Sequence, residues 1–234
     1  MKQKKMFINF AMVACATFTI INMVEADKSI IVVNQCDHDL QVGYQTNGEP
    51  NGQVIPVAQG DSSELPIEDD WAGRVWARRS CDVHDCTLAG AENPASLAEF
   101  KMNGAEDIDY YDVSFVDGYN LPMRIEPDDL ADDQPSDARH CQPTFCNTTP
   151  PCPNDLAFYH ADTNALAGCQ SACSRYKEDA YCCTGDHATP DTCTSNHFAK
   201  VVKEACPDVY TYPFDDEFSV YGCQAASYKV TFCP

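Results

Sequence analysis

The stretch DYYDVSFVDGYNLPM, residues 109–123, decides the fold of this chain, because it has the pattern of a strand that ends in a turn. Side chains alternate between the two faces of a strand. The apolar face would hold Tyr111, Val113 and Phe115. The other face begins with Asp112, and Asp117-Gly118 predicts the turn. A strand with one carboxylate near its start and another at its end lies either at a solvated edge or beside a polar cleft.

Short segments with the same alternation recur in the first half of the chain and at its end. Turn-forming pairs such as Asn47-Gly48 and Asn51-Gly52 separate several of them. The predicted strands are 29–35, 40–46, 73–80, 96–102, 110–116 and 227–233. Strands of this length and spacing predict a mainly β fold with an antiparallel β-sandwich or barrel. The last strand is expected to pair with the sheet that the first strand begins.

The first 26 residues have the pattern of a secretory signal peptide. A basic start, MKQKK, precedes an apolar run that polar residues interrupt, and Val24-Glu25-Ala26 fits a signal peptidase site. The alternative is an uncleaved membrane anchor, but the run is short for a membrane span. Cleavage after Ala26 would leave a secreted, extracellular chain of 208 residues without stable membrane insertion.

The mature chain is strongly acidic. Without residues 1–26 it has 12 basic and 35 acidic residues, a net charge of −23. This charge repels phosphate backbones and anionic lipid headgroups, so nucleic acid is not expected as a partner. The densest acidic run, residues 125–137, lacks the alternate acids, the glycine and the closing glutamate of a calcium loop. It is expected to be a solvated loop, and neither a metal nor a cofactor is expected.

Cysteine is the strongest signal in the composition. Of the 15 cysteines, Cys15 lies in the signal segment, and an even number in a secreted chain favours disulfides over catalytic thiols or zinc. Spacing alone leaves the pairing open, although the adjacent Cys182 and Cys183 sit too close for an unstrained bridge. Cysteines are sparse up to residue 140 and dense afterwards. The chain is therefore expected to divide into a β-sandwich core with a small lobe (27–140 plus 207–234) and a disulfide-rich loop and short-helix domain (141–206).

Two segments of the cysteine-rich region are expected to form short helices, 166–176 and 196–206. In the second, apolar residues recur at helical spacing, and Pro207 follows as a stop signal. The region also contains the sequon Asn147-Thr148-Thr149, which makes Asn147 the candidate glycosylation site.

The strand alternation also groups charged side chains. Arg74 would share a face with Trp76 and Arg78, and Glu99 would share one with Leu97 and Lys101. If these faces coincide with that of Asp112, an arginine and several carboxylates would gather on one sheet surface. A solvated strand face is the simpler alternative, because charged residues are normally exposed.

Several short words and the cysteine spacing resemble those of the thaumatin-like proteins. The words are WARRSC, PASLAEF, YYDVSFVDGYNLPM, CQSAC, YCCTGD, HFAKVVKEACPDVYTYPFDD and YKVTFCP. The resemblance runs from about Ile30 to Pro234 and implies a β-sandwich core, a disulfide-rich loop and helix domain and a small third lobe. The chain departs from the family pattern in RSCDVHDCTLAGAENP, where a glycine-rich segment is truncated, and in the acidic run 125–137, which looks inserted.

The resemblance also implies a partner for each of the 14 cysteines outside the signal segment. The implied disulfides are Cys36–Cys233, Cys81–Cys86, Cys141–Cys223, Cys146–Cys206, Cys152–Cys169, Cys173–Cys182 and Cys183–Cys193.

Members of the family have a cleft lined by one arginine, one glutamate and three aspartates. The matching positions are Arg74, Glu99, Asp112, Asp117 and Asp215, with Asp215 preferred to its neighbour Asp216. Carboxylates accept hydrogen bonds from sugar hydroxyls, and aromatic rings offer apolar faces to a pyranose. The candidate rings are Tyr111, Tyr119, Tyr212 and Phe214, although core packing is the simpler role for each.

The resemblance implies binding of β-1,3-glucan or another polysaccharide, antifungal defence, and in some members a weak endo-β-1,3-glucanase activity. Hydrolysis requires one protonated carboxyl group as general acid and one ionised group as nucleophile or base. By resemblance, Glu99 would be the acid and Asp117 its partner. Clustered negative charge favours this division, because it raises the pKa of at least one member.

Two functions of other classes remain open at the level of sequence. One is an inhibitor of digestive enzymes such as proteases or amylases, or another protein-binding module, which could present the shortened 81–95 loop. The other is membrane disruption, which the net negative charge disfavours. The chain is expected to be a monomer.

Overall fold

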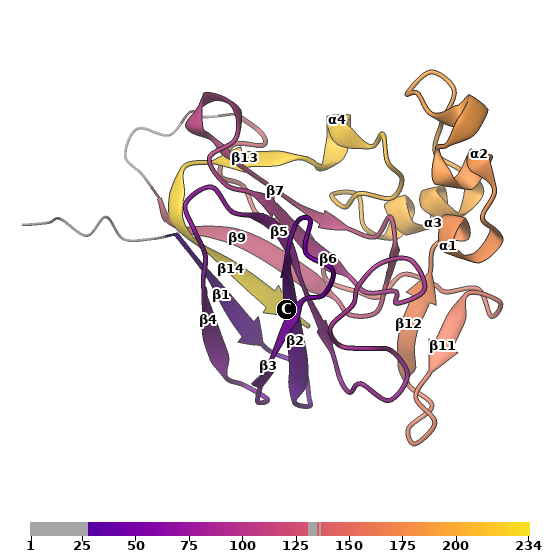
Figure 1. The fold of residues 1–234 in the computed structure, drawn as a ribbon, viewed down its shortest axis with the longest axis horizontal. Helices are drawn as coiled ribbons and strands as arrows, with labels where there is room; N and C mark the ends of the chain where they lie inside the picture. The colour runs from indigo at the N-terminus through magenta and orange to yellow at the C-terminus, as the bar shows by residue number, and fades with distance from the viewer. Residues whose placement is uncertain (1–27, 131–134, 136) are drawn as a thin grey trace, which may run out of the picture.

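The computed structural model describes residues 28–130, 135 and 137–234, which form a mainly β protein (Figure 1). The predicted signal peptide and part of the acidic run lie outside the described residues. The strands are β1 Ser29–Asn34, β2 Leu40–Thr46, β3 Gln53–Val57, β4 Ser62–Pro66, β5 Ala72–Arg78, β6 Leu97–Lys101, β7 Asp109–Ser114, β8 Gly118–Tyr119, β9 Met123–Leu130, β10 Thr144–Cys146, β11 Ala157–Tyr159, β12 Leu166–Gln170, β13 Tyr221–Cys223 and β14 Ala225–Phe232. The helices are α1 Ala172–Tyr176, α2 Asp179–Cys182, α3 His197–Ala205 and α4 Asp216–Ser219, with single 3-10 turns at Ala105–Asp107 and Gly185–His187.

Two large sheets form the body of the molecule, and a small third sheet stands beside them. Their strand orders are β10-β9-β14-β1-β4, β13-β7-β6-β5-β2-β3 and β11-β12-β8. The first and last strands, β1 and β14, run parallel from Ser29 opposite Ser227 to Asn34 opposite Phe232. The predicted pairing of the C-terminal strand with the sheet of the N-terminal strand is confirmed, and so is the mainly β fold.

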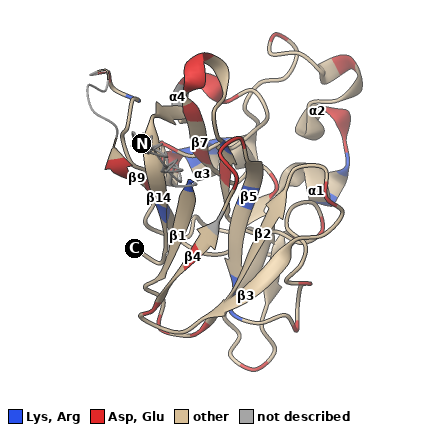
Figure 2. Cartoon of the chain, turned by 60° about the vertical axis from the view of Figure 1, so that its left-hand side comes forward, with Lys and Arg blue, Asp and Glu red and all other residues tan. Residues whose placement is uncertain are grey.

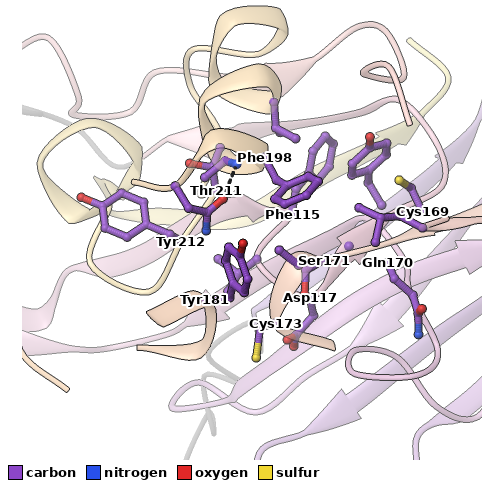
Figure 3. A pocket seen from close by; sticks show the side chains of 18 of the residues that line it. Phe115, Asp117, Cys169, Gln170, Ser171, Cys173, Tyr181, Phe198, Thr211 and Tyr212 are labelled. Atoms are coloured by element: carbon purple, nitrogen blue, oxygen red, sulfur yellow. Dashed lines mark hydrogen bonds between the residues drawn. The ribbon is translucent and has the colours of Figure 1, made fainter. Parts of the chain in front are cut away.

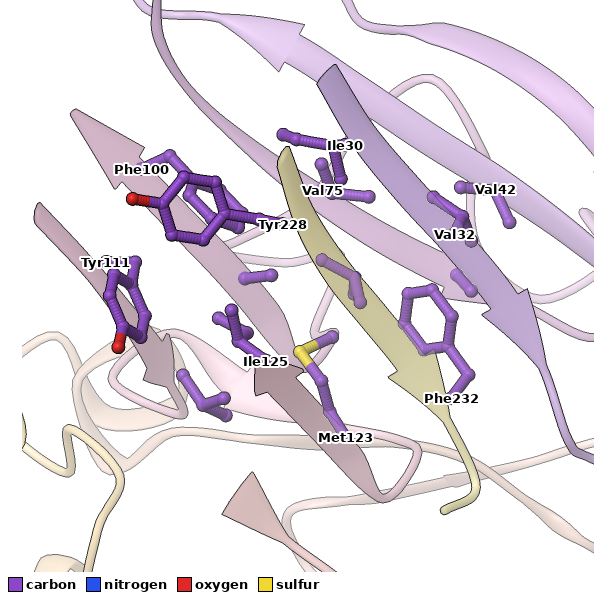
Figure 4. Packing of buried hydrophobic residues seen from close by; sticks show 14 of the residues in the cluster. Ile30, Val32, Val42, Val75, Phe100, Tyr111, Met123, Ile125, Tyr228 and Phe232 are labelled. Carbon is purple, nitrogen blue, oxygen red and sulfur yellow. The ribbon is translucent and has the colours of Figure 1, made fainter. Parts of the chain in front are cut away.

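The core fills the space between the two large sheets, as Figure 4 shows. Alternation along each strand supplies its residues, because every second side chain points inward. Tyr111 and Val113 of β7 are fully buried, and Phe115 is nearly so. The largest fully buried members of this cluster include Ile30, Leu40, Tyr111, Met123, Ile125, Tyr228 and Phe232. Each such side chain contributes about 1.5–3 kcal/mol relative to exposure.

All six predicted strands exist, and their ends differ from the predicted ends by no more than two residues. The prediction of one helix over 166–176 is wrong in its first half. Residues 166–170 form β12, which pairs with β11 and β8. Helix α1 begins only after Ser171, which has an extended backbone. The Ser171 hydroxyl oxygen caps the helix by accepting a 3.1 Å hydrogen bond from the Ser174 amide.

The prediction of a solvated loop over 125–137 is wrong for residues 125–130. These residues belong to β9, which pairs antiparallel with β14. Met123 and Ile125 are fully buried at the start of this strand, so core packing outweighs the strand-disfavouring aspartates that follow. Residues 131–134 and 136 lie outside the described residues.

Helix α3 confirms the prediction over 196–206. The Asn196 side chain caps it by accepting a 3.0 Å hydrogen bond from the Ala199 amide. Phe198 and Val202 lie one turn apart and pack against the main core. The helix therefore fixes the cysteine-rich region against the sandwich.

Seven disulfides cross-link the described chain. They join Cys36 with Cys233, Cys81 with Cys86, Cys141 with Cys223, Cys146 with Cys206, Cys152 with Cys169, Cys173 with Cys182, and Cys183 with Cys193. These are the pairs that the resemblance implies. The neighbours Cys182 and Cys183 bind different partners, and Cys183 takes a left-handed backbone conformation (φ 55°) that turns the chain between them.

The boundaries proposed for the two parts of the chain stay a prediction, because β8 of the first part pairs with β12 of the second. Asn147 is exposed in the segment after β10, and its glycosylation likewise stays a prediction. Among the described residues, no helix is both long and apolar enough to cross a membrane.

Candidate functional site

Three charged side chains lie in one row across the outer face of the six-stranded sheet. Arg74 on β5 stands directly opposite Glu99 on β6, and Glu99 stands directly opposite Asp112 on β7. Residues paired in this way have Cβ atoms about 4.5–5.5 Å apart. The neighbours of the three along their strands, such as Val75 and Val113, are buried in the core, so the row faces outward. The charged faces that the sequence left unrelated therefore coincide, and we call these three residues with Asp117 the acid row.

Asp117 lies at the Arg74 end of the row, in the turn that the sequence predicts. The Gly118 amide donates a 3.0 Å hydrogen bond to the Phe115 carbonyl, and Gly118 has a φ of +108°. Gly90, from the shortened 81–95 loop, lies against Asp117 and Arg74. A Cβ added to Gly90 would stand 2.7 Å from Asp117 Oδ2 and 3.4 Å from Arg74 Nη1. The loop thus walls the row at the Asp117 end.

Burial and mutual repulsion raise the pKa values of the acids in the centre of the row. The pKa of Asp112 lies well above its ordinary value, because the carboxyl is buried and because the charges of Glu99 and Asp216 stand close to it. Burial also raises the pKa of Glu99, although Arg74 and a hydrogen bond with Ser114 oppose that shift. The pair therefore holds protons at pH values where an exposed carboxyl group has already ionised.

Asp117 is subject to the same forces in a different balance. Burial raises its pKa, whereas the Arg74 guanidinium and a hydrogen bond from the Ala91 amide act to lower it. Both opposing contacts favour the ionised carboxylate. Burial therefore raises the pKa of all three acids, and Arg74 opposes that shift at Glu99 and Asp117 but not at Asp112.

The sequence favours Asp215 over Asp216 as the fifth cleft residue, but the surroundings of the two carboxylates favour Asp216. The Asp215 carboxylate is buried and accepts hydrogen bonds from Lys203 Nζ at 2.9 Å and from the Thr211 amide and hydroxyl at 3.0 and 2.9 Å. Asp216 is exposed, accepts a hydrogen bond from the Tyr210 hydroxyl and raises the pKa of Asp112. Asp216, not Asp215, is therefore the member whose charge reaches the acid row.

Figure 2 shows the surroundings of this arrangement: the acidic helix α4 lies close to β7, and basic residues appear on β5 of the same sheet. Arg74 supplies positive charge at one end of the row, and Asp216 of α4 adds negative charge near Asp112 at the other. Among the described residues, the acid row does not bring three ligand atoms of His, Cys, Asp or Glu within 4.8 Å of one another, and the one group that does lies elsewhere.

A cavity of about 170 Å³ opens beside Asp117, between the turn after β7 and the helices of the cysteine-rich region. Figure 3 shows Phe115, Tyr181, Phe198 and Tyr212 around it. Of the predicted aromatic residues, Tyr119 and Tyr212 line this cavity. Tyr111 is instead fully buried in the core, and Phe214 is not among the lining residues. Tyr181 and Phe198 also line the cavity, although no sequence pattern predicted them there, and their rings pack edge-to-face with centres 6.0 Å apart.

Comparison with known proteins gives a consistent family result. Residues 34–234 match the thaumatin family. A thaumatin-like protein 1 from Pyrus pyrifolia is 35% identical over 226 residues, which cover 86% of this chain and 88% of that protein. Pathogenesis-related protein 5 from Arabidopsis thaliana is 37% identical over 194 residues, covering 76% and 77% of the two chains.

Among solved structures, a GH family 64 laminaripentaose-producing β-1,3-glucanase from Paenibacillus barengoltzii aligns with a TM-score of 0.56 at 12% identity. The alignment covers 89% of this chain and 75% of that chain. At this level of identity the likeness is one of fold.

Proposed function

The chain belongs to the thaumatin family, and from this premise we propose that it is a secreted defence protein that binds β-1,3-glucan along the acid row. The observation that carries the proposal is the alignment of Arg74, Glu99 and Asp112 across three neighbouring strands, with Asp117 at the end of the row. Ionised carboxylates accept several sugar hydroxyls each, and Arg74 donates to others. An extended row suits a linear polysaccharide better than a compact ligand.

The cavity beside Asp117 supports the same proposal. Its wall includes Tyr181, Phe198 and Tyr212, and aromatic rings of this kind can pack against the apolar face of a pyranose. In this proposal the polymer lies between the β-sandwich core of residues 27–140 plus 207–234 and the domain of residues 141–206. Asp216 takes the place that the resemblance assigned to Asp215, because its charge reaches Asp112.

Slow hydrolysis of the glucan forms the second part of the proposal. Glu99 would be the general acid and Asp117 its ionised partner, as the resemblance implies. Burial raises the pKa of both and Arg74 opposes both shifts, and a hydrogen bond from the Ala91 amide further favours the charged form of Asp117. The pKa of Asp112 lies well above its ordinary value, so this carboxyl holds its proton to a higher pH than an exposed aspartate does. A row that is partly protonated binds sugar well but limits the number of carboxylates available as nucleophile or base.

Retention on insoluble β-1,3-glucan tests the binding proposal. We expect wild-type protein to sediment with the polymer, and Glu99→Gln and Asp117→Asn to remain largely in solution. Glu64→Gln is the matched control, because Glu64 is exposed on β4 of the other large sheet and its substitution removes the same charge. Equal retention of all four proteins would move the function away from the acid row.

Release of reducing ends from a soluble β-1,3-glucan tests hydrolysis separately. Loss of one general acid typically lowers a rate by about 10²–10⁴-fold. We therefore expect Glu99→Gln to lower the wild-type rate at least to the background. The same trace rate from both proteins would show that the activity does not come from this site, and binding would then stand alone.

A further inference from the structure

A second cavity, of about 160 Å³, lies between the end of β5 and the β11–β12 hairpin. None of the acid-row residues lines it. Three of the six histidines of the chain do: His38, His84 and His160. These three imidazoles have no part in the proposed glucan site.

His160, which lines this cavity, also lies beside two exposed carboxylates that are not part of the lining. The ligand atoms of Asp82, His160 and Asp162 all lie within 4.8 Å of one another. His160 Nδ1 is 3.5 Å from Asp82 Oδ1, which is too long for a good hydrogen bond. Two ligands of one tetrahedral zinc ion stand about 3.3 Å apart, given metal–ligand bonds of about 2.0–2.1 Å. The observed spacing therefore suits a shared cation better than a direct contact.

The elements that carry these ligands are held in place. Asp82 lies within the short loop that the Cys81–Cys86 disulfide closes, and the Ser80 hydroxyl donates a hydrogen bond to its carboxylate. The hairpin end is closed at His160, whose amide donates to the Ala165 carbonyl at 2.9 Å and whose carbonyl accepts from the Asn164 amide at 2.8 Å. A cation would find these groups already close together and would lose little free energy in ordering them.

An independent observation at the same cavity is the state of His84. Its side chain is only 7% exposed, and its Nε2 has no hydrogen-bond partner among the described residues. The ring stands edge-on to Phe158 of β11, with the ring centres 4.8 Å apart, so it lies against the hairpin that carries His160. A buried, unpaired imidazole nitrogen costs free energy unless a ligand or a water binds it.

We infer that Asp82, His160 and Asp162 form a site for a divalent first-row transition-metal cation of the zinc type, with the His84 imidazole facing the same cavity. An imidazole ligand selects such a cation over Ca²⁺ and Mg²⁺, which prefer oxygen ligands only. The cavity is large enough for water ligands to complete the coordination, at about 30 Å³ for each water. The bound cation would join the disulfide loop after β5 to the β11–β12 hairpin.

Arg79 is the group that would compete with a cation for the Asp162 carboxylate. Its guanidinium lies 3.6 Å from Asp162 Oδ2 and donates a 3.0 Å hydrogen bond to the Thr163 hydroxyl. Asp162 retains a second oxygen for a cation, and the bond to Thr163 can keep Arg79 at the hairpin. The salt bridge is half exposed, and ion pairs of this kind contribute little to stability, so a cation can displace it readily.

Titration with Zn²⁺ by isothermal calorimetry tests the inference on the full secreted chain, after treatment with a chelator. Excess Mg²⁺ in the buffer occupies the weak oxygen-only sites that so acidic a protein offers. We expect one Zn²⁺ per chain, and an affinity at least about tenfold lower in His160→Gln and in Asp162→Asn. Asp162 is exposed at the hairpin tip, so its variant keeps the test valid if the buried His160 variant fails to fold.

The matched control is His197→Gln, which removes an exposed imidazole on α3 and should bind Zn²⁺ like the wild type. Zn²⁺ should also raise the unfolding temperature of the wild type and of His197→Gln, and should raise that of Asp162→Asn by less. Absence of a saturable Zn²⁺ site in the wild type, or the same affinity in Asp162→Asn, would overturn the inference. Neither result bears on the glucan site, because no acid-row residue is changed.

Discussion

Lys28 Nζ and Asp109 Oδ2 lie 2.7 Å apart, and the Asp109 side chain is fully buried. The same carboxylate oxygen accepts a 2.7 Å hydrogen bond from the Tyr228 hydroxyl of β14, and the other oxygen accepts one from the Asn103 amide. Asp109 begins β7, the strand that carries Asp112. The start of the functional strand is thus tied to the opposite sheet and to the beginning of the described chain.

Replacing Asp109 by Asn should therefore lower the free energy of unfolding by about 3–5 kcal/mol, because it leaves the Lys28 ammonium without its buried partner. Chemical denaturation measures this loss. The control is Lys229→Met, which breaks a half-exposed pair with Asp128 at 3.6 Å and should cost about 1 kcal/mol or less. Similar losses in the two variants would mean that the Lys28–Asp109 pair adds nothing beyond a surface pair.

Asp112→Asn should stabilise the protein at neutral pH and make little difference near pH 4. The pKa of Asp112 in the folded chain lies well above the ordinary 3.8, because of burial and of Glu99 and Asp216. The stability that its protonated form contributes is complete below pH 3.8 and is lost as the pH rises through the raised value. The amide cannot ionise and avoids this loss.

Thermal unfolding at pH 4 and pH 7 measures the effect, with about 2–4 °C expected for each kcal/mol in a chain of this size. Asp61→Asn, which changes an exposed aspartate, should shift the unfolding temperature by the same small amount at both pH values. A gain for Asp112→Asn that is equally large at pH 4 would show that packing, and not ionisation, causes it.

Gly90→Ala should weaken glucan retention without removing any charge. The added methyl group would stand 2.7 Å from Asp117 Oδ2, so the carboxylate must shift from its present position. Gly48 provides the control, because its φ of +93° matches the +90° of Gly90 and an added Cβ meets nothing within 4 Å. Both alanines cost about 1 kcal/mol of backbone strain. Only Gly90→Ala should lose binding in the sedimentation assay, and equal retention by both would contradict the proposed role of Asp117.

The two neighbouring aspartates should separate into a structural and a functional residue. Asp215→Asn weakens the bonds with Lys203 and Thr211 and should lower the free energy of unfolding by about 3 kcal/mol. Asp216→Asn leaves that network intact and should change stability little, while it reduces glucan retention by removing a carboxylate beside Asp112. The reverse pattern in denaturation and sedimentation would restore Asp215 as the cleft residue.

Much of this molecule could be predicted from patterns that lie within single segments. Alternation placed Tyr111 and Val113 inside and Asp112 outside, and the helical spacing with Pro207 as a stop signal located α3. The wrong prediction over 166–176 arose because LAGCQ has no clear period of its own, and pairing with β8 and β11 decides that it is a strand. The acidic end of β9 was taken for a loop for a related reason, since β14 holds it in the sheet.

For the candidate sites, too, patterns within single segments do not show which distant residues come together. Alternation predicted the outward faces of Arg74 and Glu99, but only the strand register brings the two residues opposite each other. The choice between Asp215 and Asp216 depends on Lys203, which no local pattern connects to them. Asp82 and His160 meet across two distant segments, and the even number of cysteines directed the sequence analysis away from metals.

The parallel pairing of β1 with β14 has a consequence for the synthesis of this protein. β1 is an inner strand of its sheet, yet one of its two neighbours is made of residues 225–232 at the very end of the chain. Until β14 has been translated, one edge of β1 has a row of unpaired amides and carbonyls. The large sheet can close only after β14 has been synthesised, so a nascent chain that is cut short before residue 225 should be retained by chaperones rather than exported.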